Sequence, residues 1–136
     1  MPATTPEAIL QTFWTSTTSV NSLIPADDFF TGEPEDETAE PPYAVLEPLT
    51  LENHLDATGG AHVDTSELIF EIHVGEDWAK GRDLAKALFD ALHLKRLTGD
   101  TVNITEIRHR TTGKVKLSGK WIWRPVFECK VQNTGS

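Results

Sequence analysis

Residues 67–74 read ELIFEIHV, and this stretch decides how the rest of the chain is interpreted. Every second residue from Leu68 onward is apolar and shares one face, which is the pattern of a β-strand buried on that face. Asp77 follows as a candidate N-cap for a helix that extends to about residue 94. A strand that leads directly into an amphipathic helix predicts a sheet with that helix packed against it.

The predicted helix after Asp77 has one apolar stripe, and its remaining positions are largely charged. We expect the stripe to face the sheet and the charged positions to face water. The stripe is formed by Trp78, Gly81, Ala85, Leu88, Phe89 and Leu92.

Upstream of this unit, the sequence predicts a shorter helix, a strand and two polar loops. Thr5 is placed as an N-cap, and Pro6 follows at the first helical position, where its missing N–H is tolerated. Residues 43–51 have the pattern of a strand. The segments 31–42 and 52–66 are polar and rich in turn residues, and we expect both to be mobile loops.

Downstream, the pattern predicts a meander of strands. Strands are expected over residues 102–109, from Val115 onward, and over 121–131, with a turn at 111–113. Pro125 lacks a ladder donor, which predicts an edge position or a bulge there.

The predicted class is therefore α+β: an antiparallel or mixed β-sheet with one long and one N-terminal helix packed on one face. The whole chain, residues 1–136, is expected to form a single domain with a frayed tail over 132–136.

Composition limits the classes of function. The net charge is −9, which makes the chain a poor candidate for non-specific nucleic-acid or membrane binding, since both require a basic surface. No apolar run approaches the ~20 residues of a membrane span, and the N-terminus lacks a signal-peptide pattern. We therefore expect the chain to be cytosolic when made.

Charge is divided unevenly along the chain. Residues 1–79 hold sixteen acidic residues and no Lys or Arg, whereas residues 80–136 hold twelve bases and five acids. If the two halves interleave in one fold, the charges mix across the surface. Alternatively, an acidic face and a basic face exist, and the two can meet between copies of the chain.

No catalytic, metal or cofactor motif is recognised. His54 and His62 lie in one predicted loop without a rigid element to hold them as metal ligands, and the sequence has no nucleophile elbow or phosphate-binding glycine loop. Cys129 is the only cysteine and is expected to be a small buried hydrophobe. The sequence therefore predicts a protein that is not an enzyme and has no cofactor or metal.

Two charged clusters remain as interface candidates. The acidic one is interpreted as a solvated loop and not a cation site, since it lacks calcium-loop spacing. The basic one, followed by Trp121 and Trp123, has the pattern of a nucleic-acid strip, but alternation places the tryptophans in the core and leaves the bases free for an acidic partner. The candidates are Glu33, Glu35, Asp36, Glu37 and Glu40, and Arg108, Arg110, Lys114, Lys116 and Lys120.

Taken together, the order of these elements resembles the tail terminator, or tail-completion, proteins of long-tailed bacteriophages and related prophage elements. The resemblance covers roughly residues 6–131 and rests on short phrases in a fixed order. An opening amphipathic helix ends near residues 23–24. The later phrases are PYAVL at 42–46, FEIHV at 70–74, the helix that begins at 78–79, and the alternating strand at 126–131.

The resemblance implies a structural virion protein. Such proteins form a ring, usually a hexamer, on the head-proximal end of the tail tube, where they stop polymerisation and present a surface to the head connector. The implied partners are further copies of the chain, the tube protein and the connector protein, with DNA only passing through the lumen and no membrane. The implied location is the neck end of the tail, with assembly in the host cytoplasm.

Two alternatives remain open at this point. The chain could be another head–tail neck or connector component, since such proteins share small α+β folds. It could also be an acidic binding protein that inhibits a partner, which predicts a stable monomer or dimer with its acidic residues on one face.

Overall fold

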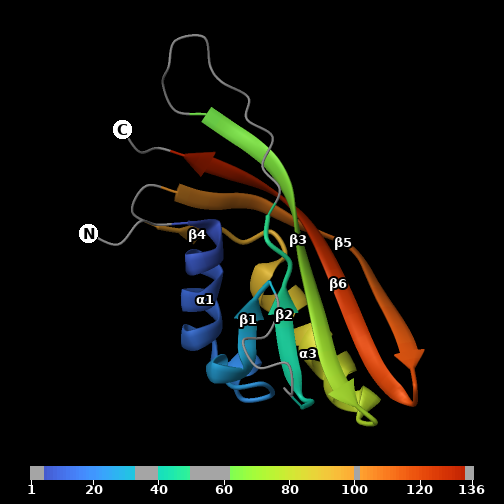
Figure 1. The fold of residues 1–136 in the computed structure, drawn as a ribbon. Helices are drawn as coiled ribbons and strands as arrows, with labels where there is room; N and C mark the ends of the chain where they lie inside the picture. The colour runs from blue at the N-terminus through green and yellow to red at the C-terminus, as the bar shows by residue number, and fades with distance from the viewer. Residues whose placement is uncertain (1–4, 33–39, 50–61, 100–101, 134–136) are drawn as a thin grey trace.

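The computed structural model describes residues 5–32, 40–49, 62–99 and 102–133. Six strands form one mixed sheet in the order β1-β2-β3-β6-β5-β4 (Figure 1). β1 runs parallel to β2, and every other neighbouring pair is antiparallel. The predicted α+β class with a mixed sheet is confirmed. The strands are β1 (Phe29–Thr31), β2 (Tyr43–Leu46), β3 (His62–Gly75), β4 (Leu97–Thr98), β5 (Val102–Leu117) and β6 (Lys120–Asn133).

Both predicted helix starts are confirmed. The side chain of Thr5 accepts a hydrogen bond of 3.1 Å from the N–H of Ala8 at the start of α1 (Pro6–Ser16). Asp77 accepts one of 3.2 Å from the N–H of Lys80 at the start of α3 (Trp78–Leu92). The short helix α2 (Thr18–Asn21) and the 3₁₀ turn η1 (Ala26–Asp28) then lead from α1 into β1.

One face of the sheet is covered by α1 and α3, and the core lies between these helices and the strands. Trp14 of α1 and Leu88 of α3 are fully buried in the same cluster as Phe70 of β3 and Phe127 of β6. The opposite face of the sheet has no helix over it among the described residues. Burial therefore separates the sheet into a covered face and an open face. None of the described helices is both long and apolar enough to cross a membrane.

The predicted apolar stripe of α3 is partly wrong. Trp78 and Phe89 are the outer members of the stripe, and they remain 44% and 38% exposed. Each lies at a flank of the helix and stacks on a neighbouring ring, Trp78 on Trp123 and Phe89 on His93. The residues of α3 that the sheet buries are Gly81, Leu84, Leu88 and Leu92.

The expected lengths of three strands also differ from the structure. β3 begins at His62, so the end of the predicted loop 52–66 is part of a strand that pairs with β6. The strand predicted over 43–51 ends at Leu46, and residues 50–61 lie outside the described part of the chain. The predicted turn at 111–113 is wrong, because these residues continue β5 and pair with β6. Register shifts earlier in β5 bend the strand without ending it.

Pro125 is not on an edge strand, because β6 lies between β3 and β5. Its neighbour on β5 is Thr112. Alternation along β6 directs the proline nitrogen toward β3, where paired residues jump from Ile69–Val126 to Ile72–Trp123. The missing N–H therefore coincides with a gap in the ladder, which is how an interior strand accommodates this proline.

Candidate assembly surface

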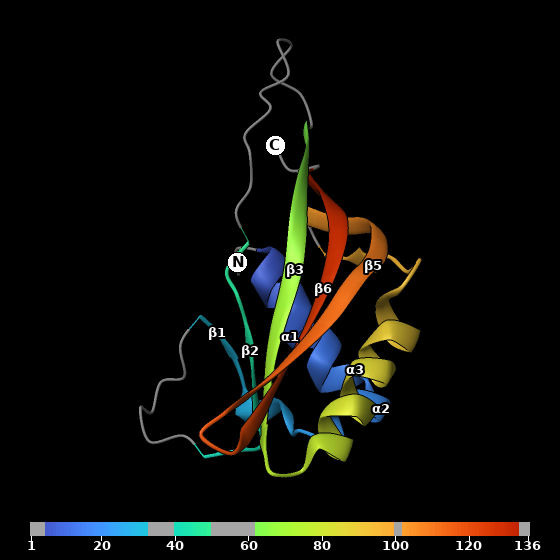
Figure 2. The ribbon, with the colours of Figure 1, turned by 90° about the vertical axis from the view of Figure 1, so that its right-hand side faces the viewer.

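β5 and β6 are joined by a hairpin at one end of the sheet, where β3 still pairs with β6 as far as Gly75 and Trp121, and no strand in the described part of the chain pairs with the outer side of β5. We call residues 111–126 the hairpin arm. Ser118 and Gly119 form its two-residue turn, with φ values of 52° and 78°, and Leu117 pairs with Lys120 across it. Two positive φ values match the primed turns that suit the twist of a hairpin. Figure 2 shows the arm reaching the same end of the molecule as the turn between β3 and α3.

The side of the arm that faces α3 has cations over aromatic rings. Nζ of Lys114 lies 5.3 Å from the ring centroid of Trp123, 5.9 Å from that of Trp78 and 6.0 Å from that of Trp121. Nζ of Lys116 lies 5.4 Å from the Trp121 ring. These distances are within the range of cation–π attraction, so the rings hold the ammonium groups close to the arm.

The open-face side of the arm exposes two aliphatic side chains. Val115 is 45% exposed and Leu117 is 57% exposed, and both are adjacent to the half-buried Ile122. Together with Gly113 and Arg124 they line a shallow hollow of about 430 Å³. Val115 and Leu117 are the exposed apolar groups of the arm that a partner could cover.

The five basic residues predicted as interface candidates all lie exposed on β5 or at the start of β6. The guanidinium of Arg110 lies 3.4 Å from the carboxylate of Glu128 and is partly neutralised by it. Lys114, Lys116 and Lys120 form no ion pair with any acidic residue in the described part of the chain. The structure therefore gathers these three charges on the arm. Their role in an interface stays a prediction.

The acidic candidates are less fully placed. Glu40 is exposed just before β2, whereas Glu33, Glu35, Asp36 and Glu37 lie outside the described residues. Two other acidic residues, Asp27 and Asp28, lie in η1 directly before β1. Because β1 is the first strand of the sheet order and the arm belongs to β5 near its other end, acidic and basic residues lie at opposite edges.

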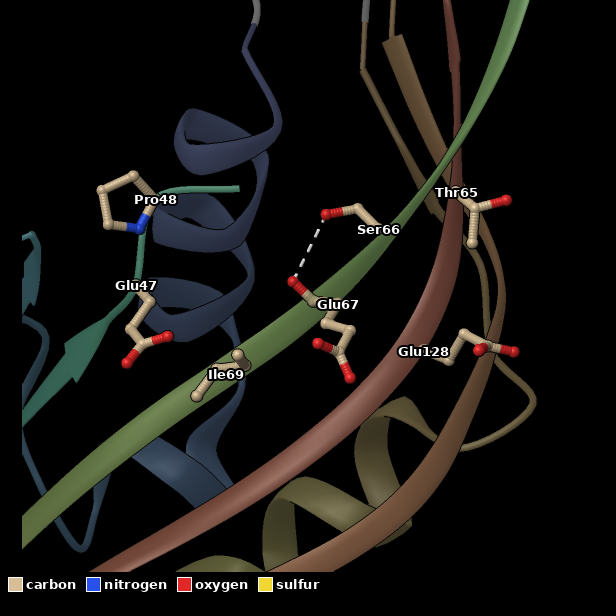
Figure 3. Close-up of a pocket in the computed structure, with 7 residues that line it drawn as sticks. All are labelled: Glu47, Pro48, Thr65, Ser66, Glu67, Ile69 and Glu128. Atoms are coloured by element: carbon tan, nitrogen blue, oxygen red, sulfur yellow. Dashed lines mark hydrogen bonds between the residues drawn. The ribbon is translucent and has the colours of Figure 1, made fainter. Parts of the chain in front are cut away.

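A second hollow, of about 330 Å³, lies beside β3 where β2 ends (Figure 3). Glu47, Glu67 and Glu128 contribute carboxylates to its lining. Ser66 also lines it, and its hydroxyl donates a 3.4 Å hydrogen bond to the backbone oxygen of Glu67. Two of the three carboxylates are paired within the chain, Glu47 with Arg124 at 3.5 Å and Glu128 with Arg110 at 3.4 Å.

The described histidines make local contacts. Nε2 of His73 lies 3.2 Å from Glu71, and Nε2 of His109 lies 2.7 Å from the hydroxyl of Thr112. Nδ1 of His93 accepts a 3.1 Å hydrogen bond from the N–H of His109. Among the described residues, no three His, Cys, Asp or Glu side chains converge as metal ligands. His54 and the side chain of His62 lie outside that part of the chain.

Cys129 is buried on the covered face, as the alternation of β6 predicts. Burial, aided by the negative charge of Glu128, raises the pKa of the Cys129 thiol to about 12. The thiol is therefore protonated at neutral pH and packs as a small apolar group.

Comparison with known proteins identifies the family. The model of the family described as tail completion protein gp17 matches residues 8–129. The chain belongs to the tail completion protein gp17 family. A chain of a solved structure titled "Virion of native gene transfer agent (GTA) particle" has a similar fold, with a TM-score of 0.71 and 15% identity over 92% of each chain. No curated protein sequence matches.

This tail completion protein is a structural component of a phage-type virion. Sequence reasoning found the basic cluster but missed three features of this candidate surface. The apolar patch around Val115 and Leu117 was assigned to an ordinary short strand, and the exposed Trp78 to the core. The acidic pair Asp27 and Asp28 was missed because β1, with only three residues, gave no strand signal.

Proposed function

We propose that this protein caps the head-proximal end of the tail tube as a closed ring, with six copies as the expected number. The ring ends polymerisation of the tube and offers its other side to the head connector. It assembles in the host cytoplasm, and DNA passes through its lumen. Membership of the tail completion family is the observation that carries this proposal.

The distribution of charge supports a ring. In a closed ring, one surface of each copy meets a different surface of the next, so the two surfaces must be complementary and not identical. Lys114, Lys116 and Lys120 lie on the β5 side of the sheet, and Asp27 and Asp28 lie on the β1 side. Opposite charges at the two edges favour contact of unlike edges and oppose contact of like edges.

The experiment is to add the purified protein to tube protein while tubes are growing. Electron microscopy is expected to show shorter tubes with extra density at one end, and the protein is expected to sediment with the tubes. Unchanged tube lengths, with the protein left in the supernatant, would contradict capping. Light scattering at low and high salt tests the electrostatic part, since screening weakens contacts between exposed charges.

The same assay separates the two alternatives. A head–tail connector component would bind isolated connectors and leave growing tubes unaffected. An acidic inhibitor would stay a monomer or dimer in the presence of tubes and of connectors. Either result would replace the capping function.

A further inference from the structure

The β1 edge and the β5 edge of the sheet can pair through their outward-facing N–H and C=O groups, and their charges are opposite. This pairing assigns the contact between subunits in the proposed ring. We propose that the β1 edge of one copy pairs antiparallel with the arm segment of β5 in the next copy. The sheet would then continue from subunit to subunit around the ring. This inference rests on the proposed function for the ring itself and adds the residues that join its copies.

The first step is the direction of free backbone groups on β5. Leu117 and Lys120 flank the two-residue turn as a hydrogen-bonded pair, so hydrogen-bonded pairs recur at every second residue back along the arm. Thr112, Lys114 and Lys116 consequently direct their N–H and C=O groups away from β6. In the described part of the chain, β4 pairs only with Asn103 and Ile104, so no strand covers this part of the edge.

The same reasoning fixes the free groups of β1. The N–H of Gly32 donates to the carbonyl of Leu46 at 2.8 Å, which places residues 30 and 32 on the β2 side of the ladder. Phe29 and Thr31 therefore face outward. The N–H of Phe29 donates a hydrogen bond to the carbonyl of Ala26. The C=O of Phe29 and the N–H and C=O of Thr31 therefore remain for pairing with a neighbouring strand.

Strand direction and register then agree. β1 is antiparallel to β5 within one subunit, so copies related by rotation about an axis along the strands present the two edges antiparallel. Phe29 and Lys114 lie at the same height along the strand direction, because a row of directly paired residues joins them across the sheet. The residues between them in this row are Ala44, Ile72 and Trp123. Pairing at that height brings outward-facing residues opposite each other, Phe29 with Lys114 and Thr31 with Thr112.

The side chains fit the same register. Phe30 falls opposite Gly113, and both belong to the open face, where a side chain added at Gly113 would meet no atom within 4 Å. The half-buried ring of Phe30 can therefore cover Gly113 and extend toward the exposed Val115. Aromatic side chains placed across edge glycines stabilise strand pairs in this way. The turn η1 directly precedes Phe29, so the exposed Asp27 lies at the Lys116 end of this pairing.

A charge exchange tests this contact. Lys116→Glu and Asp27→Lys each place like charges at the contact, and each is expected to raise the concentration for half-maximal ring assembly by at least about tenfold. The double variant restores the opposite pair and is expected to return assembly close to the original value. Lys95→Glu changes an exposed charge at the end of α3 and is the matched control. Native mass spectrometry reads the ring in solution, and co-sedimentation reads it on tubes.

The cysteine pair Phe30→Cys and Gly113→Cys gives a measurement that does not depend on charge. Oxidation of assembled protein is expected to link copies into a ladder that ends at the closed ring, and neither single variant should do so. Rings that form without cross-links, and without rescue by the double charge variant, would overturn the edge pairing while leaving the capping function intact. Absence of rings both in solution and on tubes would overturn the contact and the capping function together.

Discussion

β5 and β6 contribute to two regions of the molecule with opposite chemistry. Where α1 and α3 cover the sheet, Phe127, Cys129 and Val131 of β6 are buried with almost no exposed surface. In the hairpin arm, β5 exposes Val115 and Leu117 on one side and Lys114 and Lys116 on the other. Strand pairing alone therefore does not bury side chains, and coverage by the helices decides which residues stabilise the fold.

The consequence is a division of roles within one sheet. Side chains of the covered face contribute to stability through burial, which amounts to roughly 25 cal/mol per Å² of apolar surface. Exposed side chains of the arm contribute little in the isolated chain, so their apolar and basic character points to contacts with other molecules. Substitutions in the covered face should therefore lower the free energy of unfolding far more than substitutions in the arm.

Phe70→Ala is expected to have the largest effect. The Phe70 ring is fully buried, with its centroid 6.2 Å from that of Trp14, 6.3 Å from Phe29 and 6.1 Å from Phe127. Removing it should lower the free energy of unfolding by about 3–5 kcal/mol, as for other buried aromatic residues. Val115→Ala in the arm is the matched comparison and should change it by less than about 0.5 kcal/mol. Urea unfolding measures both, and equal losses would contradict the division.

Gly81→Ala is expected to have the next largest effect. α3 approaches β6 so closely at this position that a Cβ on Gly81 would collide with Cδ1 and Nε1 of the Trp123 ring. Overpacking should outweigh the better helix propensity of alanine, for a net loss of about 1–2 kcal/mol. Gly113→Ala in the arm has open space around the new methyl group and should leave unfolding unchanged. Thermal unfolding of both variants checks this, and a stabilised Gly81→Ala protein would contradict the close packing.

The same contrast explains how much could be predicted from sequence. The covered face has strong periodic patterns, so residues 67–74, the cap at Asp77 and the helix that follows were placed correctly. Two edge strands were missed as strands, since β1 has three residues and β4 has two, which is too short for any alternation to show. Their positions depend on neighbours distant in the sequence.

In the arm, local signals gave the wrong structure. Thr111, Thr112 and Gly113 have the composition of a turn, yet pairing with β6 keeps them extended. The continuous strand then places Lys114 and Lys116 on the side of the hairpin opposite Val115 and Leu117, an arrangement that a turn at 111–113 would not produce. The basic candidates were found because charge is read directly from composition. Their position at the edge opposite Asp27 and Asp28 required the strand order.

Cys129 gives a smaller effect that depends on pH. The pKa of its thiol is raised from 9.0 to about 12 in the folded protein, mainly by burial. Above pH 9 the unfolded chain loses this proton while the folded chain keeps it, so stability falls as pH rises toward 12, by up to about 1.4 kcal/mol per pH unit. Cys129→Ala should show a shallower decrease. Urea unfolding at pH 8 and pH 10.5 measures the difference, and parallel slopes would contradict the burial of the thiol.

The smallest expected change in stability belongs to Lys116→Glu. Lys116 is exposed and makes no ion pair with described residues, and its Nζ lies 5.4 Å from the centroid of the Trp121 ring. Its replacement should change the free energy of unfolding of the monomer by less than about 0.5 kcal/mol. If the arm serves assembly, this variant separates stability from assembly, since it should still lose ring formation. Urea unfolding below the assembly concentration measures the first property. A loss there comparable to that of Phe70→Ala would mean that the arm is part of the stable core after all.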